Sequence, residues 1–267
     1  MISTINYKLW RKACLFIRLN NTGNVNCRGV FGNLMENVPS YAALVFGVAV
    51  VATLFLVWLS HPKDKLLFIF WFLMGAASSY LVLTNVTLNA ELLSPKLLLI
   101  ILPSTLIPLL YLLTKRGKAL IHAADDDYLH YIHTVRIAVE FVLLWLHKAQ
   151  VLPVELTFEG WNYDIIIGMT APFIAQMGFQ KKFLTRKILL GWNILGILFL
   201  TNIVINAALS VPGPLHLLSL DMPNLAVLKF PYQLLPTLIV PALFFSHVVA
   251  IIRLVKKEVD VESPEED

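Results

Sequence analysis

Four side chains capable of acid–base chemistry recur along one stretch of the sequence. They are His133, Arg136, Glu140 and His147. Successive intervals of three, four and seven residues place them along one face of an α-helix. The rest of the stretch, residues 128–147, is mostly apolar. Ionisable groups in such a helix face a protein interior, a water-filled cavity or a partner when lipid surrounds it.

Two interpretations of this polar stripe remain open. Arg136 and Glu140 stand one helical turn apart, so they can neutralise each other as a structural clamp. In a functional interpretation, Arg136 binds an anionic group and Glu140 carries a proton. Haem ligation by His133 and His147 is disfavoured, because the last apolar stretch offers His247 alone where a matching pair is needed. We therefore expect no cofactor.

Two further polar sets occur in the neighbouring apolar stretches. The loop into the fifth stretch contains Glu159, Asn162 and Asp164. The sixth stretch contains Asn193, Asn202 and Asn206. In the loop, Trp161 and Tyr163 suit an interfacial belt, or Glu155, Glu159 and Asp164 form an acidic outer vestibule that concentrates cations. The amides either join helices by hydrogen bonds or line a cavity with Arg136 and Glu140. The acidic run 125–127 is better explained by a helix N-terminus than by a metal, so no metal site is expected.

The composition indicates that membrane-spanning helices position these residues. Of 267 residues, 58% are hydrophobic and 14% are charged, whereas a soluble protein has about 25% charged residues. A crossing needs about 20 mainly apolar residues. Apolar windows cover residues 41–59, 66–83, 97–114, 128–147, 164–179, 188–209 and 232–252. We therefore predict an all-α, polytopic transmembrane helix bundle with about seven spans.

Basic residues predict the orientation of this bundle. The loops after windows one, three and five, with the C-terminal flank, contain Lys63, Lys65, Lys115, Arg116, Lys118, Lys181, Lys182, Arg186, Lys187, Arg253, Lys256 and Lys257. From Met35 onward, the opposite side contains only Lys96, Lys148 and Lys229. Because basic loops stay in the cytoplasm, we expect the N-terminus outside and the C-terminus in the cytoplasm.

The chain divides into three segments. Residues 1–34 hold five basic residues and no acidic one, which conflicts with an exported N-terminus. They are either a basic amphipathic segment at the inner surface or an extension absent from the native protein, and we favour a start at Met35. Residues 35–257 form the seven-span membrane domain, and residues 258–267 an acidic disordered tail. Cys14 and Cys27 predict neither a disulfide scaffold nor a cysteine metal site.

Two stretches of the chain resemble a family of bacterial polytopic integral membrane proteins that is uncharacterised. They are His133–Leu144 (HTVRIAVEFVLL) and Leu156–Pro172 (LTFEGWNYDIIIGMTAP). The resemblance implies a multi-pass protein of the cell membrane, the bacterial inner membrane, and it transfers no activity. It singles out Arg136, Glu140, Glu159, Asn162 and Asp164.

Three functions are compatible with these patterns. The best supported is transport or binding of a small solute through a polar pathway in spans four to six. The second is a structural or assembly subunit whose polar stripe docks a membrane protein partner. The third is a lipid-modifying enzyme that uses Glu140, His133 or Asp164 as acid–base groups. The bilayer is an expected partner and nucleic acid is not, because the basic residues lie in short loops.

Overall fold

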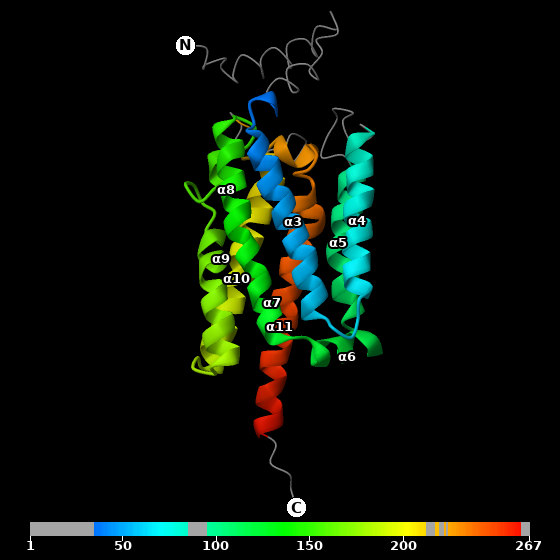
Figure 1. Ribbon diagram of the computed structural model, residues 1–267, viewed down its shortest axis with the longest axis vertical. Helices are drawn as coiled ribbons and strands as arrows, with labels where there is room; N and C mark the ends of the chain where they lie inside the picture. Colours follow the sequence, from blue (N-terminus) through cyan, green and yellow to red (C-terminus); the bar gives the residue numbers. More distant parts are fainter. Residues whose placement is uncertain (1–34, 85–94, 212–216, 219–221, 223, 263–267) are drawn as a thin grey trace, which may run out of the picture.

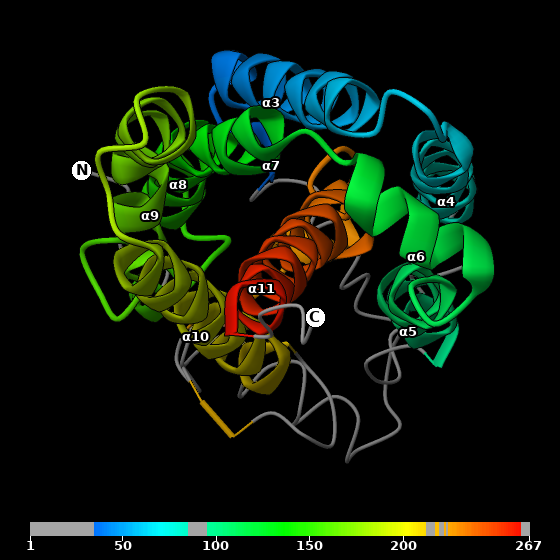
Figure 2. The ribbon, with the colours of Figure 1, turned by 90° about the horizontal axis from the view of Figure 1, so that it is seen from below.

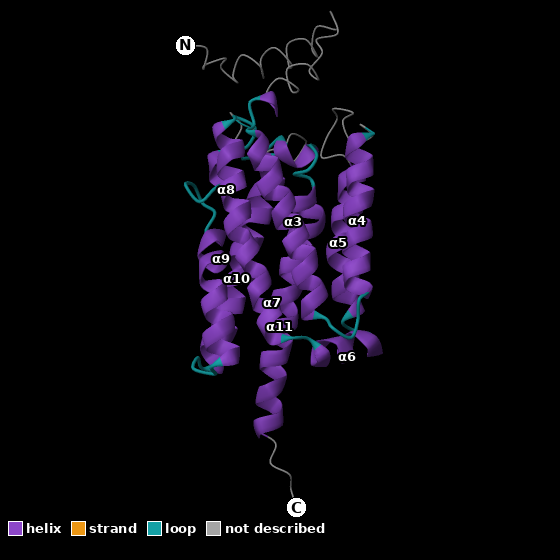
Figure 3. Ribbon diagram, viewed as in Figure 1, coloured by secondary structure: helices purple, strands orange, loops and turns teal. Residues whose placement is uncertain are grey.

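Seven long helical segments stand side by side in the computed structural model, which describes residues 35–84, 95–211, 217–218, 222 and 224–262 (Figure 1). The helices are α3 (Ser40–Ser60), α4 (Leu66–Leu83), α5 (Pro95–Tyr111), α6 (Lys115–Ala123), α7 (Asp126–Tyr131), α8 (Val135–Lys148), α9 (Asp164–Phe173), α10 (Arg186–Ser210) and α11 (Val240–Glu262). Loops and short helical turns join them, and the described residues form no strand (Figure 3). Each predicted apolar window falls on a helical segment, which confirms the all-α class.

Five of the described segments are long and apolar enough to cross a membrane. They are Ser40–Ser60, Leu66–Leu83, Asp126–Lys148, Arg186–Ser210 and Leu235–Lys256. The described apolar part of α5 is shorter, Ile100–Tyr111, and α9 has 10 residues. By length and composition, five of the described helices could therefore cross a membrane, and this criterion does not support the predicted count of seven.

The helix that carries the polar stripe lies in the interior of the bundle. About two thirds of its apolar window is buried (67%), as is 61% of the window of α11, against 28–33% for α3, α4 and α10. Seen from its end, the bundle has α11 near the centre, with α3, α7–α8, α9, α10 and the α4–α5 pair around it (Figure 2). The helix α11 packs directly against α10, α5 and α7. Polar groups on α8 and α11 therefore meet other protein groups.

Two of the long segments contain π-helical turns beside prolines. Residues Ile174–Gln180 form one just after Pro172, and Leu235–Ile239 form another that includes Pro236. Proline lacks a backbone N–H and its ring crowds the preceding turn, so regular α-helical bonding is interrupted there. Such wide turns recur at functional sites.

The basic loops of the sequence gather at one end of the molecule. The α3–α4 loop, α6, the loop before α10 and the C-terminal part of α11 all lie at the lower end in Figure 1, here called the basic end. There α6 lies across the bundle rather than along it. Arg253 joins α11 to α6 and to the start of α7, because its Nε donates to Asp126 Oδ1 (2.7 Å) and its Nη1 to the carbonyl of Ile121 (2.5 Å).

The two terminal segments of the sequence analysis fall mainly outside this description. The predicted N-terminal extension, residues 1–34, lies outside the described residues. The helix α11 continues to Glu262, past Glu258, where the disordered tail was expected to begin. Residues 263–267 also lie outside the described part.

Candidate functional site

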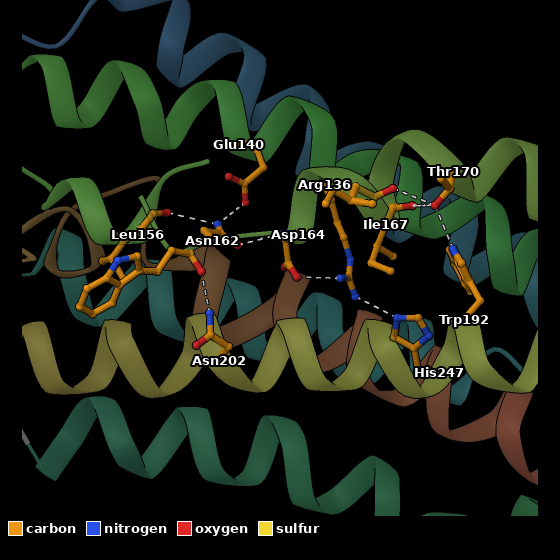
Figure 4. A network of polar contacts seen from close by, with 12 residues as sticks. Arg136, Glu140, Leu156, Asn162, Asp164, Ile167, Thr170, Trp192, Asn202 and His247 are labelled. Atoms are coloured by element: carbon orange, nitrogen blue, oxygen red, sulfur yellow. Dashed lines mark hydrogen bonds and ion pairs between the residues drawn. The ribbon is translucent and has the colours of Figure 1, made fainter. Parts of the chain in front are cut away.

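Arg136 lies near the middle of the continuous helix Asp126–Lys148 and is bonded to two other helices (Figure 4). Its Nη1 donates to Oδ1 of Asp164, at the start of α9, over 2.9 Å. Its Nη2 lies 3.0 Å from Nε2 of His247 on α11. The side chains of the ion pair are only 2% and 7% exposed. A full ion pair therefore stands inside an apolar bundle, where unpaired charges are costly.

The structural interpretation predicted an ion pair between Arg136 and Glu140, and this pairing is wrong. The guanidinium pairs with Asp164, while Oε1 of Glu140 accepts a hydrogen bond from Nδ2 of Asn162. Arg136 and Glu140 share one helix face, but Asp164 approaches the guanidinium directly from a neighbouring helix (Figure 4). Helical spacing predicted the pair Arg136–Glu140, but the packing of α9 against α8 places the carboxylate of Asp164 2.9 Å from the guanidinium.

The loop of residues 149–163 positions Asn162, and Asp164 directly after it, beside Glu140 and Arg136. The Nδ2 of Asn162 also donates to the carbonyl of Leu156 (3.2 Å), and its Oδ1 accepts from the backbone N of Asp164 (3.1 Å). Gly160 makes the turn possible, since a Cβ there would stand 2.3 Å from the carbonyl oxygen of Val154. The side chain of Asn162 thus accepts a hydrogen bond from the first backbone N–H of α9, while its Nδ2 donates to Glu140.

A directed chain of hydrogen bonds runs from Arg136 toward the basic end. Arginine only donates, so Nε2 of His247 accepts and the ring proton is on Nδ1, which lies 2.9 Å from Oδ1 of Asn193. The Nδ2 of Asn193 then donates to Nε2 of His130 over 3.1 Å. The Nδ1 of His130 lies 2.7 Å from the carbonyl oxygen of Asp126. Every donor in this chain of hydrogen bonds points the same way. The side chains of His247, Asn193 and His130 are fully buried.

We call the buried set His130, His133, Arg136, Glu140, Asn162, Asp164, Asn193 and His247 the polar network. Four of its buried atoms have no hydrogen-bond partner among the described residues: Nε of Arg136, Oε2 of Glu140 and both ring nitrogens of His133. The His133 ring instead stacks on that of His247, with centroids 3.8 Å apart and planes at 16°. His133 thus packs against a histidine of α11, and not against His147, the residue weighed with it for haem binding.

The remaining predicted residues lie apart from the polar network. His147 is only partly buried, and its Nδ1 lies 3.0 Å from the carbonyl oxygen of Leu152. Glu159 is exposed, so the predicted outer cluster divides and only Asn162 and Asp164 point inward.

The three amides of α10 also separate into two roles. Asn193 belongs to the polar network, whereas Nδ2 of Asn206 donates to Oδ1 of Asn202 (3.2 Å). The Nδ2 of Asn202 donates to the carbonyl of Trp161 (2.8 Å) and so ties α10 to the 149–163 loop (Figure 4). The hydrogen-bonding interpretation thus holds for Asn193 and Asn202, which bond to other parts of the fold.

The sequence interpretation missed the contribution of His130 and His247. His247 was weighed only for haem, and His130 only as one member of a possible metal cluster with the acidic run 125–127. The signal that could have found His247 is its place in an apolar window, because an ionisable group there is a candidate functional residue by default.

Comparison with known proteins gives a family but no function. No curated protein and no solved structure matches the chain. A family model described as a domain of unknown function (DUF8737) matches residues 96–255. The match covers more than half of the chain, includes the whole polar network and agrees with the expected kinship to an uncharacterised family. The chain therefore belongs to the DUF8737 family.

Proposed function

We propose that this protein is a multi-pass protein of the cell membrane that carries a small solute through the polar network, with Glu140 as its proton-binding group. The pathway extends beyond the predicted spans four to six, because His247 of α11 bonds directly to Arg136. Support comes from the network's contents: a charged pair, a second carboxyl group and three histidines, all inside an apolar bundle.

The proposal includes seven crossings, with the N-terminus outside and the C-terminus in the cytoplasm. The shorter helices α5 and α9 run alongside the five long ones (Figure 1). Above α9, the 149–163 loop packs into the bundle through buried residues such as Leu152, Leu156 and Asn162. Irregular backbone at membrane depth is tolerated where protein surrounds it. The basic end fits the cytoplasmic side.

The observation that carries the proposal is the incomplete bonding of the polar network. A clamp that only holds helices together gains most when each buried donor and acceptor is paired, since an unpaired buried polar group costs about 1–3 kcal/mol. Oε2 of Glu140 and both nitrogens of His133 are unpaired among the described residues. Each such atom calls for an explanation, and a water or solute that binds and leaves supplies one.

Burial also argues against the docking alternative. A stripe that docks a membrane protein partner should lie on the outer surface of the bundle. Arg136 is 2% exposed and Glu140 is 1% exposed. Both side chains are thus already enclosed by helices of this chain.

The test uses the purified full chain in liposomes on a solid-supported electrode, with a rapid pH jump as the probe. We expect a transient current, because proton binding at Glu140 moves charge part of the way across the membrane. Glu140→Gln should abolish this current. Glu159→Gln is the matched control, since that acid is exposed outside the network and the current should persist.

Two results would count against the proposal. Liposomes with protein may give no more current than protein-free liposomes, in which case no proton reaches the network. Equal currents from the wild type and Glu140→Gln would show that another group binds the proton.

A further inference from the structure

A pocket opens at the basic end between the α3–α4 loop and α6. Its volume is about 440 Å³, within the range of about 300–1,000 Å³ typical of small-ligand sites. Leu66 and Leu120 are among its apolar lining residues, and His61, Lys63 and Arg116 are the lining residues with basic side chains. Charged and apolar surfaces thus meet in one concavity beside the apolar helices.

The cations of this pocket have no anionic partner within the described protein. Lys63 and Arg116 are exposed and make no ion pair or hydrogen bond with the described residues. The one acid in the lining, Asp64, is engaged: Oδ1 accepts from the backbone N of Leu66 (2.9 Å), and Oδ2 accepts from the hydroxyl of Tyr111. The pocket therefore offers two free positive charges and a carboxylate whose oxygens already have donors.

His61 adds a buried polar atom that lacks a partner. The side chain lines the pocket and is 4% exposed. Its Nδ1 lies 2.8 Å from Oγ of Ser60 and 3.3 Å from the carbonyl oxygen of Val57. Its Nε2 is buried without a hydrogen-bond partner among the described residues. A ligand that supplies an oxygen at this atom would complete its bonding.

We propose that this pocket binds the phosphate group of an anionic ligand, either a phospholipid headgroup or a free phosphate. Phosphate oxygens pair well with both guanidinium and ammonium groups, and Nε2 of His61 can donate to a third oxygen when it carries a proton. The apolar walls of Leu66 and Leu120 suit the glycerol and acyl carbons next to a headgroup. The inference does not depend on the transport proposal, because the pocket and the polar network share no residue.

The test measures binding to the purified full chain in an uncharged detergent. Two probes are titrated separately, short-chain phosphatidylglycerol and inorganic phosphate, and dissociation constants are obtained from the rise in Tm with ligand concentration. We expect Lys63→Gln and Arg116→Gln each to weaken binding about fivefold, the effect of one basic residue near a lipid phosphate. Both residues are exposed, so the variants should fold.

Lys118→Gln is the matched control, because it removes the same charge from α6 at an exposed residue outside the pocket lining. Its binding should equal that of the wild type. An equal loss in this variant would mean diffuse attraction to the basic end and would overturn the proposal, as would no rise in Tm with either probe. Binding of the lipid alone assigns the site to a headgroup, and binding of inorganic phosphate alone assigns it to a free phosphate.

Discussion

At the scale of single residues, the two partners of Arg136 make different demands. Asp164 balances the guanidinium charge, while His247 can accept a hydrogen bond from it only through an unprotonated Nε2. The protonation of His247 and the position of Arg136 are therefore linked. A proton placed on Nε2 would turn an acceptor into a second cation and push the guanidinium away.

Removal of one member of the ion pair should be more harmful than removal of both. Asp164→Asn leaves Arg136 buried without a countercharge, which costs about 3–5 kcal/mol, so the yield and Tm of folded protein in detergent should fall sharply. Arg136→Gln combined with Asp164→Asn should recover much of this loss. The combination of Arg136→Gln with Glu140→Gln should remain poorly folded, because Asp164 then stays buried without its partner. Equal recovery by both double variants would contradict the assignment of Asp164 as the partner.

The position of His247 depends on a glycine of α10. A Cβ on Gly196 would stand 2.3 Å from both Cε1 and Nε2 of His247. Gly196→Ala should therefore displace the ring from Arg136 and lower stability by about 1–3 kcal/mol, as overpacking does. Gly191→Ala on the same helix meets nothing within 4 Å and should be neutral or raise Tm, because alanine favours helix. Similar Tm values for the two variants would show that the ring can move without cost.

At the scale of helices and loops, the sequence predicted the long helices but not the contacts between them. Apolar runs are local, so the sequence located the seven long segments but not α6 (Lys115–Ala123), and it gave the shared helix face of Arg136 and Glu140. The partner of Arg136 lies 28 positions further along and arrives through the 149–163 loop, whose path depends on tertiary packing. His247 is 111 positions away from Arg136, and no helical periodicity relates the two.

The α3–α4 connection should make stability depend on pH. Burial lowers the pKa of His61 from 6.5 to about 4, although the hydrogen bond to the carbonyl of Val57 and the charge of Asp64 act in the opposite direction. Between those two pH values the unfolded chain binds more protons at this site than the folded chain. Stability therefore falls as the pH drops from 7 to 4, by about 3 kcal/mol at most for this group.

The measurement compares Tm across this pH range for the wild type and His61→Gln, without anionic lipid. The variant lacks the titrating ring, so its Tm should decline less steeply with acid. Parallel curves would show that His61 contributes nothing to the acid sensitivity.

At the scale of the whole molecule, charge is distributed by end rather than by face. Segments that are distant in sequence, namely the α3–α4 loop, α6 and the loop before α10, come together at the basic end (Figure 1). The sequence predicted this grouping because alternate loops of a helical bundle emerge on the same side. It did not predict α6 lying across that end, or the pocket beneath it, since both depend on how α6 packs against the α3–α4 loop.

The orientation can be measured with reporter fusions. A reporter that is active only in the cytoplasm should work when fused after Lys118 or after Lys187, because basic loops are retained on that side. The same reporter fused after Glu159, in the loop at the other end of α9, should be inactive. Activity after Glu159 would contradict the proposed seven crossings.

The amide of Asn193 has a consequence for the movement of protons within the polar network. Protons hop along hydrogen bonds only where each member takes one on one side and releases another, as an imidazole does through its two nitrogens. Asn193 stands between His247 and His130 and keeps both of its amide hydrogens, one bonded to His130 and the other to the carbonyl of Leu189. Asn193 therefore interrupts proton transfer between His247 and His130. In this conformation a proton can pass between His247 and His130 only when side chains move, although hydrogen bonds connect the two rings through Asn193.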